Sequence, residues 1–166
     1  MDAIFKRRSV RRYTALAVND SQVRSILGAG MNAPSAGNEQ PWHFILVRDK
    51  ERLKNLSGSS PYASMIGGAS LAIVVCADLE LEKHKGFWVQ DCSAAVENIL
   101  VEVSALGLGA VWLGVYPRQD RIEYIRAMFA LAEPIMPFAI IPVGYPMEEV
   151  KAVDRYRQDR VHLESW

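Results

Sequence analysis

The sequence lacks the motifs of the common nucleotide-binding folds and of the common hydrolases. It contains no Gly-x-Gly-x-x-Gly, no Gly-x-x-x-x-Gly-Lys and no Gly-x-Ser-x-Gly, and so carries no signature of a dinucleotide fold, a P-loop or a nucleophile elbow. Its histidines, His43, His84 and His162, are too far apart in sequence for metal spacing. Side chains alone offer no clear catalytic site, so an enzyme of this kind would need a cofactor to carry its chemistry.

Other absences argue against further classes of protein. Two cysteines make neither a disulfide framework nor a metal set. No apolar run reaches the roughly 18–20 residues that cross a bilayer, and no apolar stretch follows the charged N-terminus as it would in a signal peptide. Lysine plus arginine (19) balances aspartate plus glutamate (19), which argues against a nucleic-acid protein. We expect one cytoplasmic domain over residues 1–166, with no membrane or nucleic-acid partner.

Hydrophobic periodicity predicts helices and strands that alternate or cluster along the chain. Residues 71–77 are apolar on both faces, which indicates a central strand that is covered on both sides. Asp20 or Ser21 is expected to cap the second helix. The class is α+β, with layers on both sides of a sheet. The expected helices are a short one ending at residue 7, a second one that Pro34 and Gly37 end, a short one that Asp49 caps and that carries Leu53 and Leu56, and two more at about 87–106 and 120–129. The expected strands are 43–48, 71–77, 110–115 and 138–143.

The predicted helix at 87–106 has apolar positions almost all the way round. A helix of this pattern is normally buried, and a domain of 166 residues can barely bury one this long. Asp91 and Glu97 lie on this helix, and a lone pair of acids there is usually a solvated or interhelical face. The pattern favours an obligate homodimer, in which the polar, aromatic tail from residue 146 to 166 docks.

Basic residues gather at the N-terminus, where Arg7-Arg8-Ser9-Val10-Arg11-Arg12 places four arginines and a serine in six positions. A guanidinium presents a planar fork of donors that fits phosphate, and a serine hydroxyl adds a neutral bond. The segment therefore indicates a site for a small, doubly charged anion. A solvated basic terminus and a nucleic-acid arm are the alternatives.

Three later segments carry further polar or small residues. Residues 33–42 form an amide-rich loop whose donors and acceptors match the edge of a heterocycle such as a flavin, although the same residues favour turns. Residues 109–117 form a strand end with small residues, where backbone can approach a flat ligand, or simply a core strand. Residues 154–160 place arginines in the tail, which either return to the phosphate site or remain solvated.

Taken in order, these segments resemble the FMN-dependent nitroreductase family. The likeness covers essentially the whole chain, near the short end of the family in length. It implies a three-layer α/β/α sandwich with a central mixed sheet, an intertwined homodimer, and two FMN molecules in clefts at the dimer interface. The matching pieces are Arg7-Arg8-Ser9-Val10-Arg11, Ala33-Pro34-Ser35 with Asn38 and Gln40-Pro41-Trp42, Gln90-Asp91 with Ala94-Ala95, Gly107-Leu108-Gly109 with Trp112-Leu113-Gly114, and Arg160-Val161-His162 with Trp166.

The resemblance assigns roles to individual positions. Arg7, Arg8 and Ser9 match the phosphate and ribityl contacts, and Arg11 belongs to the same motif. The flavin-reaching loop, in this family often from the other subunit, matches Pro34, Ser35, Asn38 and Gln40. The strand end behind the isoalloxazine matches Trp112, Leu113 and Gly114. Either Arg155 or Arg157 takes the place of a further basic residue at the phosphate.

The expected function is electron transfer from NADH or NADPH, through FMN, to a nitroaromatic, quinone or similar flat acceptor in a ping-pong cycle. The compact stretch between residues 78 and 88 suggests an open cleft, because longer family members carry extra helices there. Specialised flavin chemistry on the same scaffold, such as dehalogenation or flavin fragmentation, is one alternative. A flavin-binding module without turnover is another.

Overall fold

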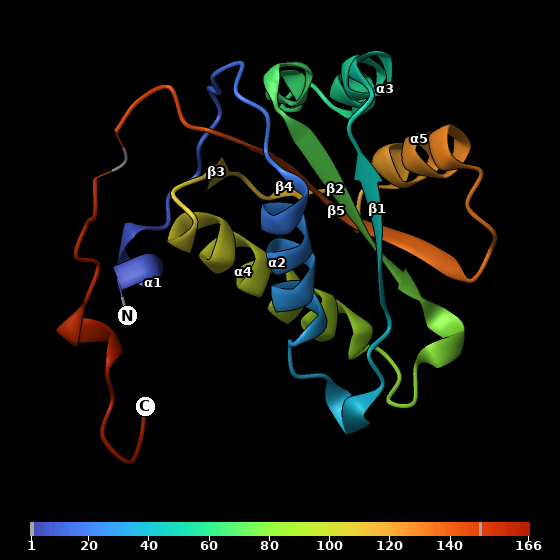
Figure 1. Ribbon diagram of the computed structural model, residues 1–166. Helices are drawn as coiled ribbons and strands as arrows, with labels where there is room; N and C mark the ends of the chain where they lie inside the picture. Colours follow the sequence, from blue (N-terminus) through green and yellow to red (C-terminus); the bar gives the residue numbers. More distant parts are fainter. Residues whose placement is uncertain (1, 150) are drawn as a thin grey trace.

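The computed structural model describes residues 2–149 and 151–166, and it has three layers (Figure 1). A five-stranded sheet lies between α2 and α4 on one side and α3 and α5 on the other. The helices are α1 (Asp2–Lys6), α2 (Asp20–Met31), α3 (Lys50–Leu56), α4 (Trp88–Ala105) and α5 (Gln119–Phe129). The strands are β1 (Trp42–Val47), β2 (Leu71–Asp78), β3 (Gly109–Ala110), β4 (Leu113–Gly114) and β5 (Ile135–Gly144). The predicted α/β/α sandwich is confirmed.

The sheet has the order β1-β2-β5-β3, with β4 also paired to β5. Its named strands pair antiparallel, and an isolated parallel bridge joins Ser9 to Ala110. β2 lies inside the sheet, as its apolar sequence predicts. Alternate side chains of β2 point to opposite layers, with Ile73 and Val75 facing α2 and α4 while Val74 faces α3 and α5.

The predicted strand at 110–115 is wrong as a single element, because it is split into β3 and β4. Both pieces keep one register on β5, with Ala110 opposite Val143 and Leu113 opposite Ile140. The break therefore falls opposite Pro142, whose ring nitrogen has no hydrogen to donate to a ladder. We call residues 109–114 the broken edge strand.

The cap of α2 also differs from the prediction. Asn19, rather than Asp20 or Ser21, is the N-cap, and its side chain accepts from the backbone N–H of Gln22. The Gln22 side chain accepts in return from the Asn19 N–H, which completes a capping box. Asp20 then lies in the first turn, where a negative charge is favourable, and pairs with Arg48 at 2.8 Å.

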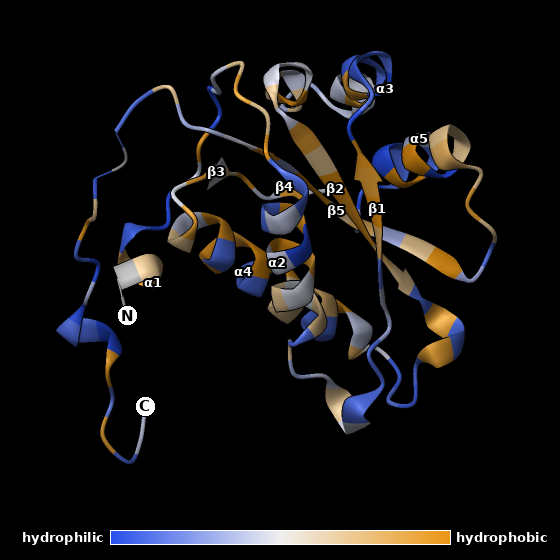
Figure 2. Ribbon diagram, in the orientation of Figure 1, coloured by the Kyte–Doolittle hydropathy of each residue, from blue (hydrophilic) through white to orange (hydrophobic). Residues whose placement is uncertain are grey.

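The long helix α4 is covered mostly by the chain itself. Val96 and Ile99 are fully buried against the sheet and α2, so the reasoning that one chain can barely bury this helix does not hold. Figure 2 shows apolar residues along much of α4, among polar ones. Half of the exposed large apolar side chains lie in α1 or along the tail. They include Ile4, Phe5, Tyr156, Leu163 and Trp166.

Both cysteines are buried and free. Burial raises the pKa of the Cys76 thiol to about 12, and burial with the nearby Asp91 raises that of Cys92 to about 12. A thiol at neutral pH is then protonated and a poor nucleophile. Within residues 2–149 and 151–166, no helix combines the length and hydropathy of a membrane span, and no three His, Cys, Asp or Glu residues gather as metal ligands would.

Candidate functional site

The basic segment, which we define as residues 6–12, lies against the broken edge strand. The Val10 N–H donates to the Ala110 carbonyl at 2.8 Å, beside the Ser9–Ala110 bridge. Gly109 allows this contact, because a Cβ at that position would lie 2.7 Å from Val10 Cβ. The broken edge strand therefore fixes the position of the basic segment and of its arginines.

The arginines of the basic segment differ in their partners. Arg7 Nε lies 3.3 Å from Glu97 Oε1 on α4, and Arg12 pairs with Glu148. Arg8 donates to the Arg7 carbonyl at 2.8 Å and to the Val153 carbonyl at 3.3 Å. Within the described part of the chain, Arg8 and Arg11 form no ion pair. Among the described arginines of the basic segment, these two have no carboxylate partner.

Two cavities meet at Arg11. A cavity of about 370 Å³ is lined by Arg8, Ser9, Arg11 and Arg12, together with Glu148 and Lys151. A second, of about 430 Å³, is lined by Arg11, Tyr62, Trp112, Leu113, Gly114 and Arg121. Seven of the predicted site residues thus line these two cavities or a neighbouring one, which is lined by Arg7 and shares Arg8 with the first.

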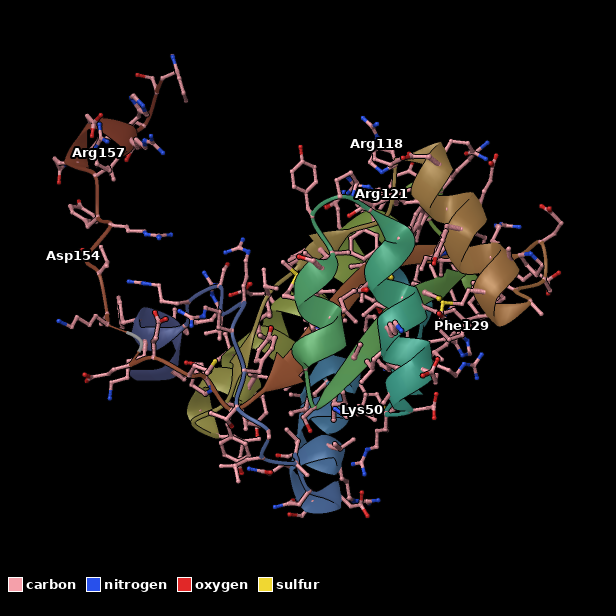
Figure 3. The ribbon with its side chains drawn as sticks, turned by 90° about the horizontal axis from the view of Figure 1, so that it is seen from above. Lys50, Arg118, Arg121, Phe129, Asp154 and Arg157 are labelled. Carbon is pink, nitrogen blue, oxygen red and sulfur yellow. The ribbon has the colours of Figure 1, made fainter. Side chains whose placement is uncertain are left out.

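The inner wall of the second cavity is the broken edge strand. Trp112 packs against Phe138 of β5 with ring centroids 5.8 Å apart, and Gly114 is exposed. Arg121, near the start of α5 (Figure 3), donates from Nη1 to the Gly114 carbonyl at 2.7 Å. Arg121 Nε is buried and has no partner among the described residues. The wall combines a flat apolar ring, an open backbone position and a cation.

The amide loop, which we define as residues 34–40, stands apart from this region. It lies at the opposite end of the molecule from β3 (Figure 1), and Pro34, Asn38 and Gln40 are exposed. The Gln40 N–H donates to Ser35 Oγ at 3.0 Å, which closes the loop on itself. One chain therefore does not bring the amide loop to the arginines.

The amide loop is held in an unfavourable backbone conformation. Gly37, Asn38 and Gln40 have φ values of 53°, 53° and 47°, in the left-handed region that costs a non-glycine residue roughly 1–2 kcal/mol. Gly37 is also constrained sterically, since a Cβ there would lie 2.5 Å from His84 Nε2. Contacts between the amide loop and the rest of the protein must therefore stabilise this backbone conformation.

Two buried acids, Glu39 of the amide loop and Asp91 of α4, stabilise the loop from its inner side, and the sequence analysis did not pair them. Glu39 is 5% exposed and Asp91 is 4% exposed, so the expectation that Asp91 lies on a solvated or interhelical face is wrong for this residue. Its Oδ1 accepts from the Ala36 N–H at 2.9 Å. The sequence offered only two separate signals, an acid in the first turn of a largely apolar helix and an acid within an amide loop.

The two tail arginines lie on the outer surface. Arg157 forms a bidentate ion pair with Asp159, in which Nε donates to Oδ1 at 2.9 Å and Nη2 donates to Oδ2 at 2.7 Å. This pairing raises the pKa of Arg157 and lowers that of Asp159. Arg155 is exposed. Figure 3 shows Arg157 far out on the tail, away from Arg121. Neither arginine lines the three cavities near the basic segment, although Arg155 is two residues from Val153, whose carbonyl accepts from Arg8.

Comparison with known proteins gives the family. The model of the Nitroreductase family matches residues 4–60 and 59–145. A protein of Methanothermobacter thermautotrophicus, whose name proposes an NADH dehydrogenase or NAD(P)H nitroreductase, is 49% identical over 100% of this chain and 87% of its own length.

Solved structures agree with that match. A crystal structure from Clostridium acetobutylicum, described with a proposed NADH oxidase activity, has a TM-score of 0.97 and 46% identity, covering 99% of this chain and 100% of that one. An FMN-dependent nitroreductase from Clostridium difficile R20291 has a TM-score of 0.92 and 33% identity, covering 100% of both chains. This chain belongs to the nitroreductase family.

Proposed function

We propose that the chain is an FMN-dependent oxidoreductase that takes electrons from NADH or NADPH. The observation that carries this is a pair of arginines without carboxylate partners, Arg8 and Arg11, at two cavities that share Arg11. The second of these cavities is also lined by Trp112 and Gly114. The FMN-dependent relative from Clostridium difficile supports the choice of cofactor, and the NAD(P)H named for the relative from Methanothermobacter supports the electron donor. Residues 1–166 act as one domain.

The residues present fit FMN in their chemistry. Arg8 and Ser9 offer charged and neutral donors to a phosphate at the first cavity. Glu148, which also lines this cavity, is already paired with Arg12. Trp112, Leu113 and Gly114 offer a flat, largely apolar wall for a ring system. FMN, when bound, supplies the hydride and electron transfer that these side chains lack.

Each residue then has a defined task. Arg11 lies between the cavities, where its charge favours negative charge at the edge of a bound ring. Arg121 fixes the Gly114 carbonyl at 2.7 Å and so holds the wall in place. Of the tail residues, Arg155 is the better candidate for the phosphate, because Arg157 is already paired with Asp159.

The proposed place of action is the cytoplasm.

The acceptor is a nitroaromatic, a quinone or a similar flat molecule. A cavity of about 430 Å³ with an exposed glycine on its wall is suited to a flat ligand. Since donor and acceptor would approach the same wall, they bind in turn, and the cycle follows a ping-pong order.

Reduction of the flavin tests this function directly. The FMN-loaded protein is expected to lose its yellow absorbance when mixed with NADH or NADPH without oxygen, and to regain it when a nitroaromatic or quinone is added. Stopped-flow absorbance measures both steps. Loss of colour that no acceptor of these classes reverses would point to specialised flavin chemistry. A protein that binds FMN and is never reduced by either nicotinamide would be a flavin-binding module.

The proposed enzyme is a homodimer in which the amide loop of one chain reaches the flavin held by the other. Two features support this: the amide loop stands apart from the arginines of its own chain, and the tail leaves Leu163 and Trp166 uncovered. Obligate interfaces of this kind exceed roughly 2,000 Å². Sedimentation at low micromolar concentration is expected to give twice the chain mass of 18.6 kDa. A flavin-loaded monomer would refute the proposal.

A further inference from the structure

Glu39 and Asp91 present an unusual arrangement of hydrogen-bond acceptors. Glu39 Oε2 accepts from the Lys83 N–H at 2.7 Å and from the His84 N–H at 3.0 Å. Asp91 Oδ1 accepts from the Ala36 N–H at 2.9 Å. The other two oxygens, Glu39 Oε1 and Asp91 Oδ2, are buried and have no donor among the described groups. A buried acceptor without a donor is costly.

One proton shared by the two carboxyl groups would supply the missing hydrogen bond between Asp91 Oδ2 and Glu39 Oε1. Three backbone N–H groups face the pair, so the surroundings favour negative charge and oppose a bound metal cation. Two carboxylates in one buried site cannot both ionise readily, and pairs of this kind titrate as a unit. One negative charge and one proton satisfy every oxygen, with the Asp91 hydroxyl donating from Oδ2 to Glu39 Oε1.

The charged groups around the pair agree with this assignment. Burial raises the pKa of Asp91, and although the Ala36 N–H opposes the rise, Glu39 and Glu82 increase it. Burial also acts to raise the pKa of Glu39, but the N–H groups of Lys83 and His84, the Asp91 hydroxyl and the His84 charge leave it below its ordinary value. The Lys83 ammonium lies outside the pair, 3.3 Å from the Gly37 carbonyl. The proton therefore belongs to Asp91.

The pair joins three segments that are separate in sequence. Asp91 holds the amide loop to α4 through Ala36, and Glu39 holds it to the turn at Lys83 and His84. The same loop contains the left-handed residues Gly37, Asn38 and Gln40. We propose that Glu39 and Asp91 share one proton and that this proton holds the amide loop in its flavin-binding shape, a role in flavin binding that rests on the proposed function.

The direction of the pH dependence follows from proton linkage. Asp91 binds its proton more tightly in the folded protein than in the unfolded chain, so its contribution to stability falls as pH rises from the ordinary aspartate range through its raised pKa. Above that point, two buried charges repel each other and the loop opens. FMN binding linked to one proton then weakens by up to about tenfold per pH unit.

Infrared spectroscopy of the full-length, flavin-free protein tests the shared proton. A protonated-carboxyl C=O band is expected at neutral pH and is lost on alkaline titration. The band should be absent from Asp91→Asn and from Glu39→Gln, in which the glutamine amide donates to an ionised Asp91. Glu102→Gln is the matched control, a carboxyl of α4 that instead accepts from Ser25, and it should keep the band. A wild-type protein without the band overturns the proposal, whether or not FMN binds.

Two readouts test the effect on the loop. Trypsin cleavage after Lys83 or Lys85 should accelerate toward alkaline pH in the wild type relative to Asp91→Asn, and this needs no flavin. The FMN dissociation constant should rise with pH in the wild type and stay flat in Asp91→Asn, whose amide keeps a donor to Glu39. Equal pH profiles for the two proteins in trypsin cleavage overturn the loop-holding role. A protein that shows the band and the cleavage difference but binds no FMN contradicts the proposed function alone.

Discussion

Replacing Arg8 with alanine is expected to weaken FMN binding by about ten- to a hundredfold while leaving riboflavin binding unchanged. A charge-assisted bond from a guanidinium to a phosphate contributes about 1.5–3 kcal/mol, and each 1.4 kcal/mol corresponds to about a factor of ten. Riboflavin lacks the phosphate and cannot gain from Arg8. Isothermal titration of both flavins into the flavin-free proteins measures the difference. The purified variant should be pale, and excess FMN should restore its activity.

Matched variants separate this effect from loss of charge. Arg24→Ala on α2 removes the same charge from an exposed position outside both cavities, and it should bind FMN as the wild type does. Arg8→Lys should recover only part of the affinity, because an ammonium lacks the planar fork. Arg7→Ala should weaken binding less than Arg8→Ala, because Arg7 already pairs with Glu97. If Arg8→Ala holds FMN as tightly as the wild type, the basic segment is only a solvated terminus.

The substitution Gly109→Ala is expected to displace the basic segment and so to weaken both folding and FMN binding. The new methyl would lie 2.7 Å from Val10 Cβ and Cγ1 and 2.8 Å from Cγ2. Val10 cannot move away without lengthening its bond to the Ala110 carbonyl, so the basic segment must shift. Overpacking of this kind costs about 1–3 kcal/mol. Urea denaturation should show lower stability, and FMN titration should show weaker binding.

Gly28→Ala is the matched control for this change. A Cβ at Gly28 meets nothing within 4 Å, and alanine in a helix is favoured over glycine by about 0.5–1 kcal/mol. This variant should therefore be more stable and bind FMN normally. Adding Val10→Ala to Gly109→Ala removes two of the three colliding atoms and should recover part of both losses. If Gly109→Ala were as stable as Gly28→Ala, the packing of Val10 would not determine the position of the basic segment.

The strongest local patterns predicted the fold well. β2 was found from its hydrophobic run, because it is buried along almost its whole length, and α4 from its apolar positions, since eight of its residues are buried. The break between β3 and β4 was missed, because it depends on Pro142 lying opposite, about thirty residues away in sequence. The N-cap of α2 was missed by one residue, because three neighbouring side chains, Asn19, Asp20 and Ser21, can all cap a helix.

The candidate site was predicted as a set of residues and not as a network of partners. The arginine motif could be read locally, but the pairing of Arg7 with Glu97 depends on how α4 lies. The same limit hid Glu39 and Asp91, which are 52 positions apart and meet only when the amide loop folds onto α4. Tertiary contacts of this kind leave no periodic pattern in a sequence.

The way the basic segment is anchored has a consequence for when the protein can take up its cofactor. The basic segment is held by Ala110 of β3, about a hundred residues away in sequence, and Ala110 is held in turn by Val143 of β5. Contacts this distant in sequence form late in folding, and β5 is completed only at Gly144. The phosphate site is therefore expected to form only after β3 has paired with β5, so we expect FMN to be captured late in folding, by a chain whose sheet is already assembled.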